Sequence, residues 1–114
     1  MSDRGLPTHV EVASILRRAA VSGDFATVVR KGDQDRGSLL LVVSSRGRHI
    51  ALLERVLGAR GDYGWERVGP PESASSAEIS DFLGKRARFD EDFWAIELDI
   101  ADPERFIAET TAAG

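Results

Sequence analysis

Hydrophobic and polar residues alternate most regularly in the stretch Phe89–Ile100. From position 94 onward every second residue is apolar: Trp94, Ile96, Leu98 and Ile100. The positions between them include Glu97 and Asp99. A period of two predicts a strand with one buried face and one solvent-exposed face.

Three further stretches, residues 25–31, 38–45 and 50–57, are rich in β-branched and large aliphatic residues and are typical of strands. The middle one contains Leu39–Val43, which is apolar at every position and therefore predicts a central strand. The polar residues 32–37 and the reversal around Gly47 join the three by short turns, so we expect an antiparallel meander. The sequence also allows a short strand over residues 65–68.

Apolar residues spaced three and four apart predict helices in three places. The first follows a capping box formed by Thr8 and Glu11, and it ends at Gly23. The second follows Ser75, and a short third one begins after Asp102. The element order α-β-β-β-(β)-α-β-α predicts an α+β single domain, with a mainly antiparallel sheet and helices packed on one face. We expect an ordered core from about residue 8 to 108 and frayed ends.

Composition narrows the class of protein. The chain has 114 residues and no cysteine, which predicts one domain and excludes disulfides. No secretory signal and no membrane-spanning apolar run are visible in the sequence, so we expect no membrane contact. The net charge of −4 argues against nucleic acid. Residues 1–60 carry +4 and residues 61–114 carry −8, an asymmetry that favours a protein partner or self-association unless folding mixes the two halves.

Two acidic segments are candidates for metal chemistry. Asp33 and Asp35 resemble the opening of a calcium loop, but Ser38 and Ser44 occupy the places of its glycine and glutamate. A hairpin loop with Asx-turns explains this segment better. The second segment contains Asp90 and Asp92 and lies close in sequence to the acids of the 94–100 strand. A solvated acidic sheet edge, which discourages the addition of another strand, explains this segment better than a magnesium site does.

No cofactor motif is present, and the two histidines lack metal-ligand spacing, so we expect neither a cofactor nor a metal and identify no catalytic residue. We expect Trp94 and Trp65 to be core aromatics. Arg17 and Arg18 fall outside the apolar stripe of the first helix and are candidates for binding a partner. Alternatively, they pair with acids of the C-terminal half and hold the helix to the sheet.

Several stretches together resemble one family: Ala13–Ala19, Arg30–Gly37 with Leu39–Val43, Trp65, and Phe89–Glu97. The chain resembles, over roughly residues 8–100, the small alphaproteobacterial proteins grouped as domain-of-unknown-function family 1491. The resemblance implies a cytoplasmic bacterial protein of one domain. The family has no established activity, so the resemblance implies no catalytic or binding residue.

Two hypotheses about function follow from these observations. The first is a non-enzymatic binding or adaptor domain, because the chain lacks a catalytic constellation and its charge is split. The alternative is a divalent-metal-dependent hydrolase or nuclease that uses either Asp33 and Asp35 or Asp90 and Asp92.

Overall fold

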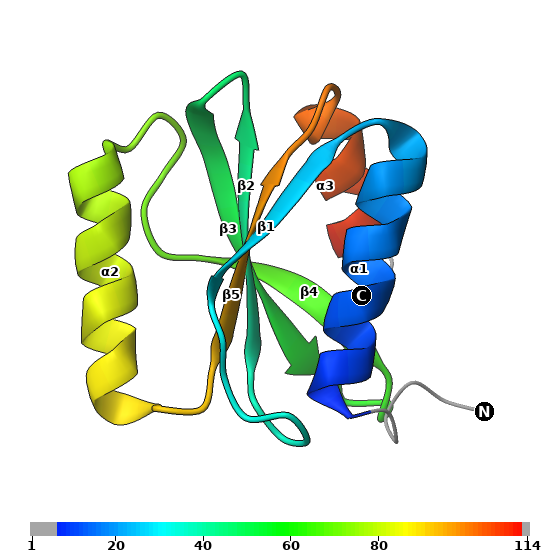
Figure 1. Ribbon diagram of the computed structural model, residues 1–114, viewed down its shortest axis with the longest axis vertical. Helices are drawn as coiled ribbons and strands as arrows, with labels where there is room; N and C mark the ends of the chain where they lie inside the picture. Colours follow the sequence, from blue (N-terminus) through cyan, green and yellow to red (C-terminus); the bar gives the residue numbers. More distant parts are fainter. Residues whose placement is uncertain (1–6, 113–114) are drawn as a thin grey trace.

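The computed structural model describes residues 7–112 and contains three helices and five strands within that range. The helices are α1 (Thr8–Ser22), α2 (Ser76–Phe89) and α3 (Pro103–Ala112). The strands are β1 (Phe25–Arg30), β2 (Leu39–Ser45), β3 (Arg48–Leu57), β4 (Tyr63–Val68) and β5 (Trp94–Asp99). This arrangement confirms the predicted α+β class and the order of elements (Figure 1).

The five strands form one sheet in the order β1-β5-β2-β3-β4. Strands β2, β3 and β4 are a true antiparallel meander. The predicted meander of the first three strands is wrong, however, because β5 lies between β1 and β2 and runs parallel to β2. Leu41 of β2 is opposite Ile96 of β5 in this parallel pair. Local sequence patterns define strands but carry no information about a partner so distant in the chain.

Strand β5 shows the predicted alternation, with Trp94, Ile96 and Leu98 buried on one face. Its other face is not entirely solvent-exposed, because Ala95 is fully buried while Glu97 is exposed. Ala95 is buried because α2 packs against this face of the sheet, where the sequence pattern did not predict a helix.

The helices cover both faces of the sheet, so the expectation that they pack on one face is wrong (Figure 1). Helices α1 and α3 cover the face that carries Leu41 and Ile96. Helix α2 covers the other face, where Phe82 packs against a cluster containing Leu40 and Phe93. Strand β2 is apolar on both faces, and each face must be shielded from water by its own helical layer.

The N-terminus of α1 is held by the loop between β1 and β2, and the capping box predicted there is wrong. Pro7 is the N-cap residue and makes no side-chain capping bond. The Thr8 hydroxyl donates instead to the Gly37 carbonyl at 2.8 Å. Glu11 faces the sheet, where its Oε1 lies 3.2 Å from Nη1 of Arg55. The side chains that were expected to cap the helix therefore anchor it to the sheet and the loop.

The starts of the other two helices match the sequence. Ser75 and Glu78 form the predicted capping box, in which each side chain accepts the backbone N–H of the other residue. Asp102 accepts the Arg105 N–H at 3.2 Å in the first turn of α3. Helix α3 continues to Ala112, beyond the ordered core expected to end near residue 108. The fraying expected of residues 1–6 and 113–114 falls outside the described range and stays a prediction.

Candidate functional site

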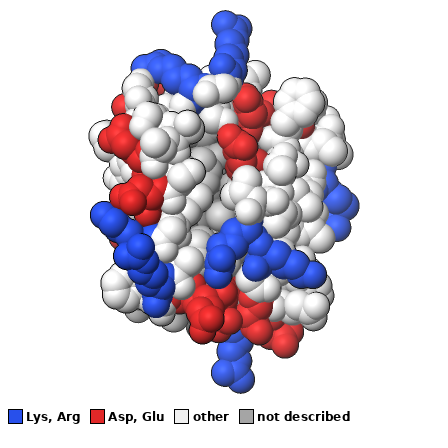
Figure 2. Space-filling view, turned by 60° about the vertical axis from the view of Figure 1, so that its left-hand side comes forward, with Lys and Arg blue, Asp and Glu red and all other residues white. Residues whose placement is uncertain are grey.

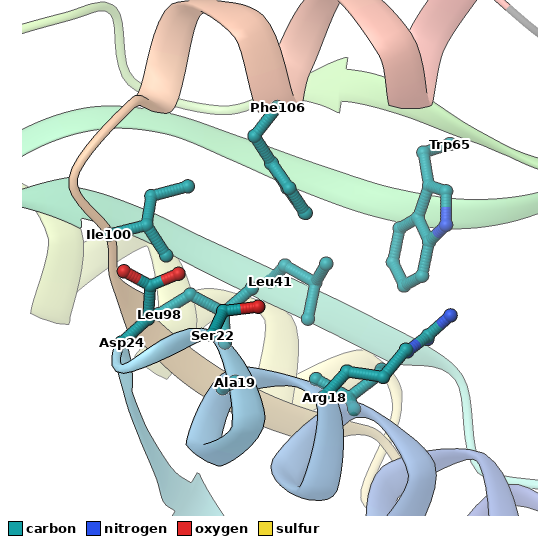
Figure 3. A pocket seen from close by; sticks show the side chains of 10 residues that line it. Arg18, Ala19, Ser22, Asp24, Leu41, Trp65, Leu98, Ile100 and Phe106 are labelled. Atoms are coloured by element: carbon teal, nitrogen blue, oxygen red, sulfur yellow. The ribbon is translucent and has the colours of Figure 1, made fainter.

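A cavity of about 270 Å³ lies between α1 and α3 on one face of the sheet (Figure 3). Leu41, Leu98 and Ile100 of the β2–β5 region form its apolar floor. Phe106 enters from α3 and Trp65 from β4. Because the lining comes from several segments that are far apart in the sequence, the cavity exists only in the folded chain.

One face of α1 supplies the remaining wall. Its lining residues are Ile15, Arg18, Ala19 and Ser22, spaced three and four apart as neighbours on one helical face. Arg18 is exposed and extends toward Trp65 at one end of the cavity (Figure 3). Within residues 7–112 no ion pair neutralises Arg18. The cavity therefore combines an apolar interior with a positive charge at its rim.

The opposite end of the cavity is acidic. Asp24 lies there beside Ser22, well away from Arg18 (Figure 3). Asp24 follows the Gly23 cap of α1, and its Oδ1 accepts the Ala101 N–H at 3.2 Å. The cavity therefore has a positive charge at the Arg18 end and a negative charge at the Asp24 end.

Only one of the six candidate site residues of the sequence lines this cavity. Arg18 does so, whereas Arg17 is exposed beside it on α1 and is not part of the lining. No sequence pattern identified Asp24, Trp65 or Phe106 as site residues, because each is ordinary in its own segment. Their positions depend on how α3 and β4 meet α1 across the sheet.

Asp33 and Asp35 lie in the loop between β1 and β2, where Asp33 forms the expected Asx-turn. Its Oδ2 accepts the N–H groups of Arg36 at 2.9 Å and Asp35 at 3.0 Å. These two bonds, that from Arg36 first, lower the pKa of the Asp33 carboxyl. The Asp33 carboxylate thus has a local role in shaping the loop.

Acidification is expected to weaken the fold through Asp33 and Glu78, because hydrogen bonds from backbone N–H groups lower the pKa of both carboxyls. Such groups stabilise the native state above their unfolded-state pKa values, about 3.9 for Asp and 4.3 for Glu, and this stabilisation disappears as pH falls through the native pKa. Urea unfolding of wild type and Asp33→Asn at pH 7 and pH 3 measures the effect. Asn keeps an acceptor oxygen, so we expect the variant to lose less stability on acidification than wild type does. An identical loss in both proteins would contradict the role of Asp33.

Asp90 and Asp92 lie in the connection between α2 and β5. Asp90 Oδ1 accepts the Asp92 N–H at 3.0 Å, and Asp90 Oδ2 lies 3.7 Å from Arg86 Nη2. Arg86 also donates to Glu54 at 2.6 Å, and this bond, with the nearby carboxylates, raises the pKa of its guanidinium. Asp90 therefore belongs to an ion-pair cluster that joins α2 to the sheet.

The two acidic segments are neighbours, since the Asp33 N–H donates to the Asp92 carbonyl at 2.9 Å. Figure 2 shows acidic side chains gathered at the end of the molecule where α2 leads into β5. Within residues 7–112, however, no group of three or more acidic or histidine side chains could hold a metal ion. The backbones of the two acidic segments are close together, but their carboxylates do not form one metal-coordinating group.

The two oppositely charged halves of the sequence are connected by ion pairs in the fold. Arg86 pairs with Glu54, and Arg48 lies 3.3 Å from Glu72. Figure 2 accordingly shows basic and acidic side chains on the same face of the molecule. The Arg48–Glu72 pair joins a basic residue of the first half to an acidic residue of the second half, and it neutralises part of the charge asymmetry within the domain. Arg17 and Arg18 do not take part in this pairing within the described part of the chain.

The protein is a small α+β domain with an open, mostly antiparallel sheet and a cavity on one face of that sheet. The model of the family "Protein of unknown function (DUF1491)" matches residues 6–108. The chain belongs to the DUF1491 family, and the resemblance seen in the sequence is confirmed.

Solved structures with the same fold include a DUF1491 family protein from Caulobacter crescentus CB15, known from a crystal and an NMR structure. Both are 32% identical to this chain with a TM-score of 0.73. The crystal comparison covers 89% of this chain and 94% of the other, and the NMR comparison 90% and 92%. Protein Atu0922 from A. tumefaciens, 24% identical over 85% of this chain and 87% of its own, shares the fold with a TM-score of 0.72. A search of curated proteins found no match.

No helix within residues 7–112 has both the length and the apolar character that crossing a bilayer requires.

Proposed function

We propose that this protein is a non-enzymatic binding domain whose site is the cavity between α1 and α3. The observation that carries the proposal is a surface-connected cavity with an apolar floor and, at its rim, the charge of Arg18, which forms no ion pair within residues 7–112. Concave sites with a mostly apolar lining and a few polar groups are the usual form of binding sites. In this proposal a partner protein inserts one apolar group above Leu98 and Ile100. A cytoplasmic location remains part of the proposal.

The arrangement of the acids favours binding over the metal-dependent hydrolase. That reaction needs carboxylates that converge on a metal or a substrate. Asp33 serves its own loop, and Asp90 pairs with Arg86. Asp35 and Asp92 are exposed. No observation on these four side chains supports a shared catalytic centre.

Substituting both arginines of α1 separates a binding role from a structural one. Since neither Arg17 nor Arg18 forms an ion pair within residues 7–112, we expect the double change to alanine to alter unfolding free energy by no more than roughly 0.5 kcal/mol. Partner capture should be lost, because Arg18 lines the cavity. Urea unfolding and affinity capture measure the two effects. A larger loss of stability that couples to charge reversal at Asp90 or Asp92 would instead assign a structural role.

Filling the cavity tests the site itself. Ser22 is exposed at the end of α1 and lines the cavity, so Ser22→Leu should obstruct it without disturbing the buried core. Ala20 is exposed on the same helix and does not line the cavity, which makes Ala20→Leu a matched control. We expect partner capture to fall with Ser22→Leu and to persist with Ala20→Leu. Equal capture by both variants would place the binding surface elsewhere.

Self-association is the other form that this binding could take. Light scattering after size-exclusion chromatography distinguishes the two, because a self-associating wild type should become monomeric on Ser22→Leu. A monomeric wild type that loses its partner on the same change indicates a different protein as the ligand.

A further inference from the structure

We infer that the cavity recognises the C-terminal residue of a partner chain, with an apolar side chain inside and the terminal carboxylate at Arg18. This inference rests on the proposed binding function and specifies its ligand. It follows from three properties of the site: its size, its apolar floor and the placement of its two charges.

The cavity is large enough to hold one apolar side chain. A volume of about 270 Å³ corresponds to the liquid volume of about nine water molecules. Sites for drug-sized ligands span about 300–1,000 Å³, so this cavity lies just below that range. The floor of Leu41, Leu98 and Ile100 offers no charged partner, and an apolar side chain of moderate size is the occupant that it favours.

The charges select an anion at one end. Arg18 presents a guanidinium, which binds a carboxylate through two parallel N–H donors. Asp24 lies at the other end and would repel a second negative charge (Figure 3). A bound carboxylate is therefore directed to the Arg18 end, beside Trp65, and the attached apolar group to the floor between the two ends.

A C-terminal apolar residue has this combination of groups within a single residue. Its side chain and its carboxylate are attached to the same Cα atom, so both reach the site without ordering further residues of the partner. Capture of a terminal carboxylate is also an established mode of peptide recognition. An internal apolar residue lacks the charge unless a neighbouring acid supplies it, and ordering that second side chain costs entropy.

The probe is the tripeptide acetyl-Gly-Gly-Leu with a free carboxylate, titrated into the ¹³C-methyl-labelled full chain. Methyl signals of Leu41, Leu98 and Ile100 report on the cavity floor. We expect these signals to shift with the free acid. The C-terminal amide should bind about tenfold more weakly, because a hydrogen-bonded charge is lost. Acetyl-Gly-Gly-Gly should leave these signals unchanged.

Arginine variants test whether Arg18 is the group that binds the terminal carboxylate of the peptide. Arg18→Ala should weaken binding of the free-acid peptide by about the same tenfold factor and leave binding of the amide peptide unchanged. Arg17→Ala is the matched control, because Arg17 is exposed on the same helix and does not line the cavity. Arg18→Lys should restore part of the affinity, since it keeps the charge but loses the two-donor geometry.

Three results would overturn the inference. Equal binding of the acid and the amide would remove the carboxylate from the recognition. If acetyl-Asp-Leu-amide bound as tightly as acetyl-Gly-Gly-Leu, the ligand would be an internal acidic segment of a partner chain. Equal binding of hexanoate would indicate a free aliphatic acid as ligand. If the tripeptide fails while Ser22→Leu still abolishes partner capture, the cavity remains the site and only the C-terminal chemistry is rejected.

Discussion

Trp94→Ala is expected to destabilise the protein by about 3–5 kcal/mol, as deletions of large buried aromatic side chains do. The Trp94 side chain belongs to the main core cluster, and the residue is only 5% exposed. Its indole Nε1 donates to the Asp33 carbonyl at 2.7 Å, so the same side chain ties the β1–β2 loop to β5. Removing it leaves a cavity and deprives that carbonyl of its donor. Equilibrium unfolding in urea measures the loss.

Trp94→Phe separates the two contributions. Phenylalanine keeps an aromatic ring in the core but cannot donate to the Asp33 carbonyl. We expect an intermediate loss of about 1–2 kcal/mol, the range for a partly buried acceptor that loses its donor. A change below roughly 1 kcal/mol for Trp94→Ala would show that the indole contributes little to the core, contrary to its burial.

Gly32→Ala is expected to have the second-largest effect, a destabilisation of about 3 kcal/mol. A Cβ atom at Gly32 would collide with the Asp92 carbonyl oxygen and lie 2.6 Å from the Phe93 carbonyl carbon. These are backbone atoms of the neighbouring segment and cannot rotate away. The Asp33 N–H donates to the same Asp92 carbonyl at 2.9 Å, so separating the segments would also break this hydrogen bond. Thermal and urea unfolding of the variant measure the cost.

Gly84→Ala is the matched control for this steric argument. Gly84 lies inside α2, and a Cβ atom there meets nothing within 4 Å. Alanine has the higher helix propensity, so the control should stabilise the protein by about 0.5–1 kcal/mol. If Gly32→Ala were as harmless as Gly84→Ala, the close approach of the two segments would be wrong.

The candidate site shows where sequence reasoning stopped. Arg18 could be identified because it falls outside the apolar stripe of a strongly periodic helix. The acids at Asp33 and Asp90 stood out by clustering, yet one shapes its own loop and the other joins an ion-pair cluster. Trp65 and Phe106 gave no signal, because a lone aromatic in a short element looks the same whether it fills the core or lines a cavity. A cavity is a property of the space between elements.

The sequence by itself determined the helices and strands, and the N-terminal caps of α2 and α3. Periods of two and of three to four are local, since they arise from backbone geometry within one segment. The same holds for the capping box at Ser75 and Glu78, where both partners lie within one helical turn. The stretch Leu39–Val43 also showed correctly that β2 is central, because only a strand covered on both faces can be apolar throughout.

Only the tertiary structure decided how these elements combine. It inserted β5 between β1 and β2, placed α2 on the opposite face from α1 and α3, and directed Thr8 to the Gly37 carbonyl in place of a cap. Each of these outcomes depends on contacts between segments far apart in the chain. Their free energy comes from burying complementary surfaces against one another, and no single segment contains both surfaces.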